Sequence, residues 1–145
     1  MLIKRLQSGD EQLAKKIISQ VKLQDKSTVI DAEHLTDLCD SKDTYVIAAF
    51  DDANPAAFLI AYLLPRLAEL KPMMLFYEIE VLEKYHRRGI GTALIDKLKE
   101  YCQEIGICKM WVLTNESNIA AMKLYQSTGG KLAADDDMVM FVYKD

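Results

Sequence analysis

The chemically most informative part of the sequence is residues 81–94, which read VLEKYHRRGIGTAL. A strand ends here, a basic loop follows, and Gly89 and Gly91 begin an amphipathic helix. The start of a helix offers unpaired backbone N–H groups and the positive end of the helix dipole. Glycine has no Cβ, so the backbone can approach an anion closely. Since Arg87 and Arg88 add positive charge, the segment predicts a site for a pyrophosphate group.

Two common phosphate-binding motifs do not fit these glycines. A dinucleotide-binding fingerprint needs a third glycine, and Leu94 stands in its place. A P-loop needs Gly-Lys-Ser/Thr, whereas Gly91 is followed by Thr92 and Ala93. The glycines alone therefore leave one alternative open, a surface helix with solvated arginines.

The surroundings of the glycines resemble a known family. Residues 86–94, HRRGIGTAL, lie a short loop after Val81 and resemble motif A of the GNAT acetyltransferases, Gln/Arg-x-x-Gly-x-Gly/Ala. Residues 118–129, NIAAMKLYQSTG, resemble motif B of the same family, Asn-x-x-Ala-x-x-Leu-Tyr-x-x-x-Gly. The chain is therefore identified as a GNAT member. Within the family it is most similar to gentamicin-type aminoglycoside 3-N-acetyltransferases, through residues 48–51, 61–66, 76–81 and 140–142.

The resemblance implies acetyl-CoA as the donor and a primary amine as the acceptor. The backbone from Arg87 to Thr92 would hold the pyrophosphate, while Val81 would bind the pantetheine arm or the thioester carbonyl. His86 stands where the family has Gln or Arg, so a side-chain role there is in doubt. The CoA-binding residues implied by the resemblance are Ile79, Val81, His86, Arg87, Arg88, Gly89, Ile90, Gly91, Thr92, Asn118, Ala121 and Tyr125.

Acetyl transfer by direct attack in a ternary complex needs a base, because an alkylammonium must lose a proton before it attacks. Glu78 and Glu80 are two apart on a predicted strand and so share a face. The resemblance places Glu78 first as the base and leaves Glu80 to bind a cationic acceptor. The alternative is that one of them lies on an exposed edge or pairs with a basic residue.

Tyr125 is the candidate general acid for the departing thiolate, since it occupies the tyrosine position of motif B. The alternative for a tyrosine on a helical stripe is core packing. Cys102 and Cys108 lie on or just after the preceding helix, where we expect burial and not nucleophilic catalysis. His34 and His86 show no metal-ligand spacing, and we expect no metal.

The acceptor is expected to be a small cationic molecule, and an aminoglycoside acceptor would make the protein an antibiotic-resistance enzyme. Residues 135–137, three aspartates, could line the acceptor site or form a solvated loop. Two alternatives stay open: acetylation of a protein or peptide amine, and a non-catalytic acetyl-CoA-binding module.

The elements that position these residues form an alternating pattern. Strands are expected over residues 2–6, 45–50, 56–64, 73–81, 109–114 and 138–143, and a capping box at residues 8–11 is expected to start the first helix. Further helices are expected from Asp31, over residues 90–105, and from Ser117 or Asn118 to Gly129. We predict a single α/β (α+β) domain over residues 1–145. The GNAT resemblance implies a mixed, mostly antiparallel, twisted sheet of six to seven strands with about four helices.

Composition excludes several other classes of protein. The 145 residues carry 18 Lys and Arg against 22 Asp and Glu, a net charge of −4, which argues against a broad nucleic-acid surface. Three cysteines without a C-x-x-C motif indicate free thiols. The amino terminus lacks signal-peptide features and no apolar run approaches the ~18 residues of a membrane span. We expect a cytoplasmic protein without membrane or nucleic-acid partners; the resemblance and the apolar strand over residues 56–64 allow a homodimer.

Overall fold

The computed structural model describes residues 1–107, 109–133 and 139–144. Strands and helices alternate along the chain, with one π-helical turn (η1) and one 3-10 turn (η2) between them. The elements are β1 (Leu2–Arg5), α1 (Glu11–Ile17), η1 (Ile18–Lys22), α2 (Ala32–Asp40), β2 (Thr44–Asp51), β3 (Asn54–Leu64), β4 (Met73–Val81), η2 (Glu83–Tyr85), α3 (Ile90–Ile105), β5 (Met110–Trp111) and α4 (Ile119–Ser127).

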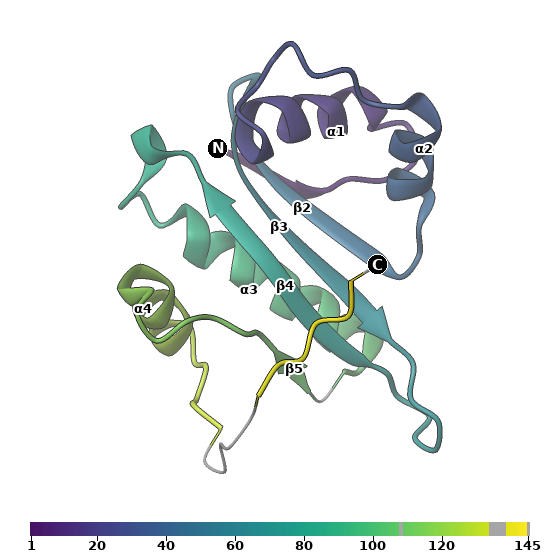
Figure 1. Cartoon of the computed structure of the whole chain (residues 1–145), viewed down its shortest axis with the longest axis vertical. Helices are drawn as coiled ribbons and strands as arrows, with labels where there is room; N and C mark the ends of the chain where they lie inside the picture. The colour runs from purple at the N-terminus through teal and green to yellow at the C-terminus, as the bar shows by residue number, and fades with distance from the viewer. Residues whose placement is uncertain (108, 134–138, 145) are drawn as a thin grey trace.

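The five strands form one sheet in the order β1-β2-β3-β4-β5. The first four pair antiparallel and β5 joins β4 in parallel. Helices α1 and α2 cover one face of the sheet and α3 covers the other (Figure 1). The predicted α/β class and the mixed, mostly antiparallel sheet are thus confirmed.

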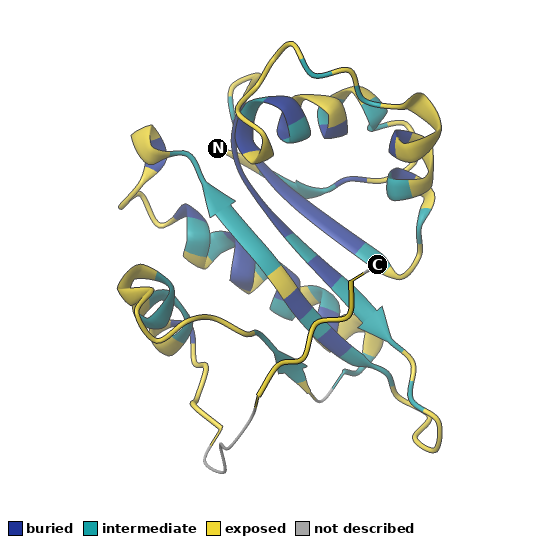
Figure 2. Cartoon of the chain, in the orientation of Figure 1, coloured by how far each residue is buried: buried dark blue, intermediate teal, exposed yellow. Residues whose placement is uncertain are grey.

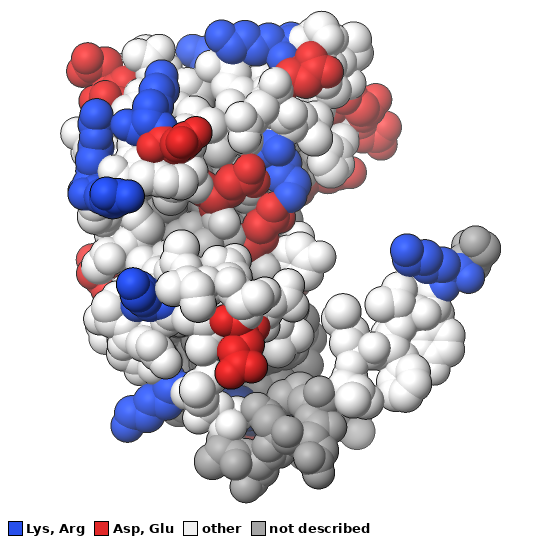
Figure 3. All heavy atoms as spheres, turned by 60° about the vertical axis from the view of Figure 1, so that its left-hand side comes forward, with Lys and Arg blue, Asp and Glu red and all other residues white. Residues whose placement is uncertain are grey.

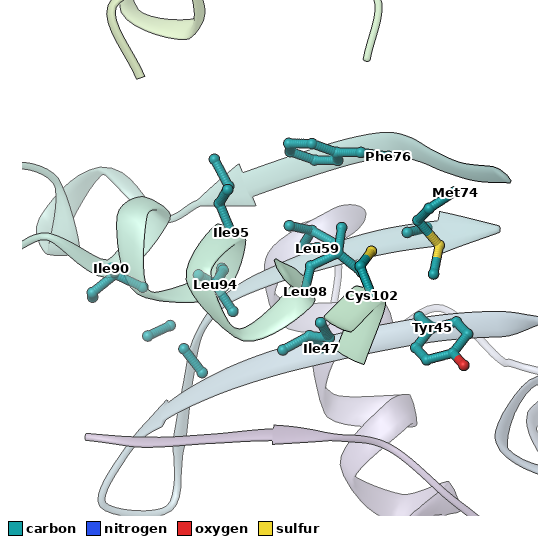
Figure 4. Close-up of a cluster of buried hydrophobic side chains, with 14 of the residues drawn as sticks. Tyr45, Ile47, Leu59, Met74, Phe76, Ile90, Leu94, Ile95, Leu98 and Cys102 are labelled. Carbon is teal, nitrogen blue, oxygen red and sulfur yellow. The ribbon is translucent and has the colours of Figure 1, made fainter. Parts of the chain in front are cut away.

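Alternation along the central strands divides the apolar side chains between two cores. On β2, Tyr45, Ile47 and Ala49 pack toward α3, whereas Val46 and Ala48 pack toward α1 and α2. Figure 4 shows the α3 side, where Leu94, Leu98 and Cys102 lie over Ile47, Leu59 and Met74. Both faces of β2 and β3 are buried in consequence, as Figure 2 shows. The apolar segment at residues 56–64 thus serves the core.

A β-bulge at Tyr77 interrupts this alternation on β4. Ile60 pairs with Glu78 and Ala61 pairs with Phe76, so Tyr77 has no partner on β3. Before the bulge Phe76 faces α3, and after it Ile79 and Val81 face α3. Glu78 and Glu80 are thereby turned to the opposite face, on the side of α1 and η1.

Strands β4 and β5 separate soon after they meet. Their parallel pairing comprises only Met74 with Met110 and Leu75 with Trp111. Beyond Leu75 no described strand lies beside β4 on this edge, although β4 continues to Val81. On this side, called the gap side below, no described strand pairs with the edge of β4 over residues 76–81.

Several expected elements differ from those observed. The described residues form five strands, not six to seven, because residues 131–133 and 139–144 form no strand. Residues 139–144 are exposed and stand away from the body (Figure 3), so no described strand is beside them to complete a ladder. The strand expected over residues 109–114 is only the two residues of β5. The expected aspartate cluster at residues 135–137 and Cys108 lie outside the described residues.

The helix ends follow the sequence signals with one exception. Asp31 caps α2 by accepting the His34 N–H at 2.9 Å, and α3 ends at left-handed Gly106. The prediction of a capping box at residues 8–11 was wrong: α1 begins at Glu11, and Asp10 stands at its N-cap. The carboxylate of Asp10 accepts hydrogen bonds from Lys4 and from the backbone N–H of Gln7, which fixes it to the preceding turn.

None of the helices in the described part of the chain combines the length and apolarity that a membrane crossing requires.

Candidate active site

The first part of the candidate site is the start of α3. Gly89 precedes the helix with φ of 75°, a left-handed conformation that glycine adopts without strain. The first helical hydrogen bond is donated by Ala93 to the Gly89 carbonyl at 3.0 Å. The N–H groups of residues 90–92 thus have no intrahelical acceptor, and they share the positive end of a 16-residue helix dipole.

Gly91 is required for a different reason, namely close packing. A Cβ at this position would lie 3.1 Å from a methyl carbon of Leu124 and 3.9 Å from one of Ile79. Helix α3 therefore approaches α4 and β4 closely at its first turn. The two glycines predicted as one motif have separate functions, one in backbone conformation and one in packing.

The basic residues of the loop surround this helix start. Arg87 has φ of 60°, which is unusual for a residue with a Cβ, and its side chain is exposed. Arg88 is also exposed, and its guanidinium lies 5.3 Å from the centre of the Tyr85 ring. Tyr85 is buried and holds the loop on the α3 core. Thr92 is exposed, whereas Ile90 is buried and can offer only its backbone to a ligand.

His86 links the loop to the end of β4. Its Nε2 donates a hydrogen bond to the carbonyl oxygen of Val81 at 2.7 Å. The histidine in place of the usual Gln or Arg therefore has a structural partner of its own, and it satisfies a backbone acceptor at the point where the strand ends.

The second part of the site is the unpaired edge of β4. Leu82 donates to the carbonyl of Ala56, which makes Ala57 and Val81 a non-hydrogen-bonded pair of the antiparallel ladder. The ladder alternates, so the N–H groups of Ile79 and Val81 point away from β3 and toward the gap side. They lie beside the start of α3, because Ile79 is next to Gly91.

The third part is an acidic pair on the other face of β4. Glu78 forms a salt bridge with Lys22 of η1, and its side chain is 28% exposed. The carboxylate of Glu80 forms no hydrogen bond or salt bridge with another described residue. Burial raises the pKa of Glu80; the charge of Lys22 counteracts this rise and the charge of Glu78 adds to it. The raised pKa makes the Glu80 carboxylate a stronger base than an ordinary glutamate.

Tyr125 lies on the gap side of β4. Its ring meets that of Phe76 edge to face, with the centroids 5.4 Å apart. Burial raises the pKa of the Tyr125 hydroxyl, so the phenol keeps its proton at neutral pH. The ring packs against the core while the side chain is only half-buried, and the general-acid role of Tyr125 stays a prediction.

Asn118, one of the two residues expected to start this helix, is the N-cap of α4. Its Oδ1 accepts the backbone N–H of Ala121 at 3.1 Å. The carbonyl end of this side chain is therefore occupied, and only its NH₂ group is available to a ligand. Ala121 is half-buried on the same first turn.

The structure thus brings the sequence-predicted residues together in two sets along β4. The helix start, the loop and the Ile79–Val81 edge lie on the gap side, and Glu78 and Glu80 lie on the opposite face. Lys22 was missed, because no motif surrounds it and its partner is 56 residues away. Leu124, which lies within motif B, is the contact that requires glycine at position 91.

Charge on the surface is dispersed in the view of Figure 3, where basic and acidic side chains alternate without a broad basic patch. Among the described residues, no group of three or more His, Cys, Asp or Glu side chains is arranged to hold a metal ion. Cys39 and Cys102 are buried free thiols, and burial raises the pKa of each.

The separated β4 and β5 strands and the glycine-started α3 are the geometry of the candidate site, and the class of protein follows from comparison with known families. A family model described as "Acetyltransferase (GNAT) family" matches residues 15–129. The chain therefore belongs to the GNAT acetyltransferase family, as the two motifs predicted, and acetyl-CoA is the donor that this family uses.

Two curated proteins illustrate the relationship. The uncharacterized protein YxbD of Bacillus subtilis is 34% identical over 95 residues, which are 65% of this chain and 54% of that protein. The [ribosomal protein bS18]-alanine N-acetyltransferase of Escherichia coli is 36% identical over 53 residues, 37% of this chain and 36% of that enzyme. The chain thus matches about half or less of the length of these curated relatives.

Similarity to solved structures covers nearly the whole chain. An aminoglycoside acetyltransferase from an uncultured soil metagenomic sample, in complex with trehalose, has a TM-score of 0.82 and 27% identity, covering 99% of this chain and 95% of that one. The same enzyme in complex with sisomicin has a TM-score of 0.82 and 26% identity over equal shares. These likenesses agree with the predicted fold.

We predict that Gly89→Ala weakens CoA binding beyond its effect on stability. An alanine at φ of 75° is strained, which lowers the free energy of unfolding by about 1 kcal/mol, and relief of the strain would redirect the N–H groups at the helix start. Gly9→Ala is the matched control, because Gly9 has φ of 97° with open space around it.

Chemical denaturation and calorimetric CoA titration measure the two effects. Both variants should lose similar stability, and only Gly89→Ala should lose roughly tenfold or more in CoA affinity. Equal CoA affinity in the two variants would contradict the assignment of the helix start as the pyrophosphate site.

Proposed function

We propose that the protein transfers the acetyl group of acetyl-CoA to a primary amine of a small polycationic molecule, with aminoglycosides among the acceptors. The observation that carries the proposal is the juxtaposition of an unpaired β4 edge with the free start of α3. The β4 edge offers backbone groups to an extended chain, and the start of α3 offers backbone N–H groups to an anion. In CoA the extended chain is pantetheine and the anion is the pyrophosphate.

The residues on the gap side fit such a co-substrate. The N–H groups at the start of α3, with Arg87 and Arg88 beside them, would hold the pyrophosphate. The N–H of Val81 would bind the pantetheine arm, and the N–H of Ile79 would meet the thioester carbonyl, where negative charge develops during attack. Acetyl-CoA supplies the activated acyl group as a thioester. The NH₂ group of Asn118 would reach the same arm from the α4 side.

The acceptor would approach from the face of β4 that carries Glu78 and Glu80. Two carboxylates beside one another favour a cation, and the net charge of −4 favours its approach. The structural relative crystallised with sisomicin is itself an aminoglycoside acetyltransferase, which supports a polyamine-rich acceptor. The bS18-alanine acetyltransferase among the relatives supports a second candidate, acetylation of a protein amino terminus.

Glu80 is the better candidate for the base, in contrast to the order that the resemblance suggested. Its pKa is raised by burial and by the neighbouring Glu78, and it makes no salt bridge with a described residue. Glu78, already paired with Lys22, is better suited to bind and orient an ammonium group. A base with a raised pKa accepts the proton of an alkylammonium more readily at neutral pH.

We predict turnover with small polycations. Purified protein, acetyl-CoA and one acceptor (sisomicin, spermidine or a peptide beginning with alanine) are mixed, and release of the CoA thiol is followed. We expect release with sisomicin or spermidine to exceed that with the peptide. Turnover with the peptide alone would support the amino-terminal alternative, and CoA binding with no turnover of any amine would support a non-catalytic module.

We predict that Glu80 controls the acidic limb of the pH–rate profile. The base must be ionised, so kcat/KM should fall as the pH drops through a pKa above the ordinary glutamate value of about 4.3. Glu80→Gln should lower kcat by roughly 10²-fold or more and remove this limb. Glu78→Gln should keep the limb but move it to lower pH, since a like charge is lost. A limb that persists in Glu80→Gln would exclude Glu80 as the base.

We predict that Tyr125→Phe lowers kcat by roughly 10²-fold while CoA affinity changes less than threefold. Phenylalanine keeps the edge-to-face contact with Phe76, so only the proton donor is removed. Single-turnover kinetics and calorimetric CoA titration measure the two quantities. An unchanged kcat would assign Tyr125 to packing alone.

A further inference from the structure

Lys22 carries a primary ammonium group to the carboxylate face of β4. It is the last residue of η1, and its Nζ donates a hydrogen bond to Oε1 of Glu78. Glu80 is close enough for its charge to act on Lys22 as well. A primary ammonium beside these two carboxylates is also what a cationic acceptor would present. Lys22 therefore offers Glu78 and Glu80 the same chemical group that the acceptor would offer them.

The backbone holds Lys22 in this position. The π-helical turn is closed by the Leu23 N–H, which donates to the Ile18 carbonyl at 2.8 Å, five residues earlier. Val21, directly before Lys22, is fully buried in the core beneath α1 and α2. The Ser19 hydroxyl of η1 donates a hydrogen bond to the Lys15 carbonyl of α1 at 2.8 Å. Lys22 thus projects from a fixed turn, while its own side chain stays 45% exposed and can move.

We propose that Lys22 competes with the acceptor for the Glu78–Glu80 carboxylates and so sets the affinity and selectivity of the acceptor site. A single ammonium must displace Lys22 from Glu78 to bind. A polycation can contact Glu80 first and displace Lys22 with a second ammonium group. Lys22 therefore disfavours monoamines more than polyamines. The proposal rests on the proposed function, because it assigns this face of β4 to the acceptor.

The charge of Lys22 is present throughout the neutral range. The hydrogen bond to Glu78, together with the charges of Glu78 and Glu80, raises the pKa of Lys22. The ammonium form therefore persists to a higher pH than in a free lysine. At physiological pH Lys22 thus remains a charged competitor of the acceptor for the two carboxylates.

The test compares Lys22→Gln with two controls. Lys22→Arg keeps a cation at the carboxylates. Lys4→Gln removes one positive charge from a second salt bridge between separate elements, Lys4 to Asp10 at 2.8 Å, away from the acidic pair. It therefore changes the net charge by the same amount and controls for general attraction of cations.

Calorimetric titration with sisomicin, spermidine and the monoamine butylamine measures binding without any turnover. We expect Lys22→Gln to bind butylamine roughly fivefold more tightly, an upper value for a partly exposed ion pair, and to gain less for spermidine and sisomicin. Lys22→Arg and Lys4→Gln should bind as the wild type does. Thermal unfolding of each variant reports any structural contribution of the two salt bridges.

Each outcome decides the proposal. Equal amine affinity in Lys22→Gln and wild type, with or without a lowered Tm, would make the salt bridge structural and overturn the proposal. Equal gains in affinity for Lys4→Gln, or an absence of amine binding in all variants, would also overturn it. Tighter binding in Lys22→Gln without acetylation of any amine would keep the competition and remove the acetyltransfer proposal. Acetylation of an amine by the wild type, with unchanged amine affinity in Lys22→Gln, would keep the acetyltransfer proposal and remove the competition.

Discussion

One unpaired residue on β4, Tyr77, determines which side chains the two faces of that strand present. Side chains alternate strictly along a strand, so the bulge reverses the faces of every residue after it. Without it, Glu78 would continue the row of Met74 and Phe76 and be buried under α3, where an unpaired carboxylate is costly. With it, Ile79 continues that row, and the carboxylates emerge beside Lys22. Because of the bulge, the alternating residues from 78 to 81 place apolar side chains on the α3 face of β4 and carboxylates on the opposite face.

The two halves of the candidate site differ in what they are made of. The gap side depends mainly on backbone: the N–H groups at the start of α3, the N–H groups of Ile79 and Val81, and a glycine at position 91 that leaves room for Leu124. This explains why His86 can replace the usual Gln or Arg, for its hydrogen bond to Val81 serves the loop itself. The acidic face depends instead on side chains, namely the carboxylates of Glu78 and Glu80.

The sequence predicted what local patterns determine and missed what pairing between distant segments determines. The bounds of β4, the end of α3 at Gly106 and the cap at Asn118 were predicted correctly, because strand alternation, left-handed glycine and capping side chains act over a few residues. The bulge was not predicted, since it depends on the register of β4 against β3. Nor was Lys22, whose role depends on a π-helical turn packed against another part of the sheet. The short β5 also escaped prediction, because the splay of two strands leaves no mark in hydrophobic periodicity.

The unpaired edge of β4 has a further consequence for the behaviour of the protein at high concentration. Backbone donors and acceptors that are free to meet a pantetheine chain are equally free to meet the strand of another molecule, which is how edge strands promote aggregation. The separation of β4 from β5 limits this exposed edge to residues 76–81. Lys22 compensates the charge of Glu78, but the carboxylate of Glu80 leaves a negative charge on this short segment, so two copies aligned edge to edge would bring like charges together. The charge of Glu80 therefore also opposes the aggregation that the open edge would otherwise favour in a crowded solution.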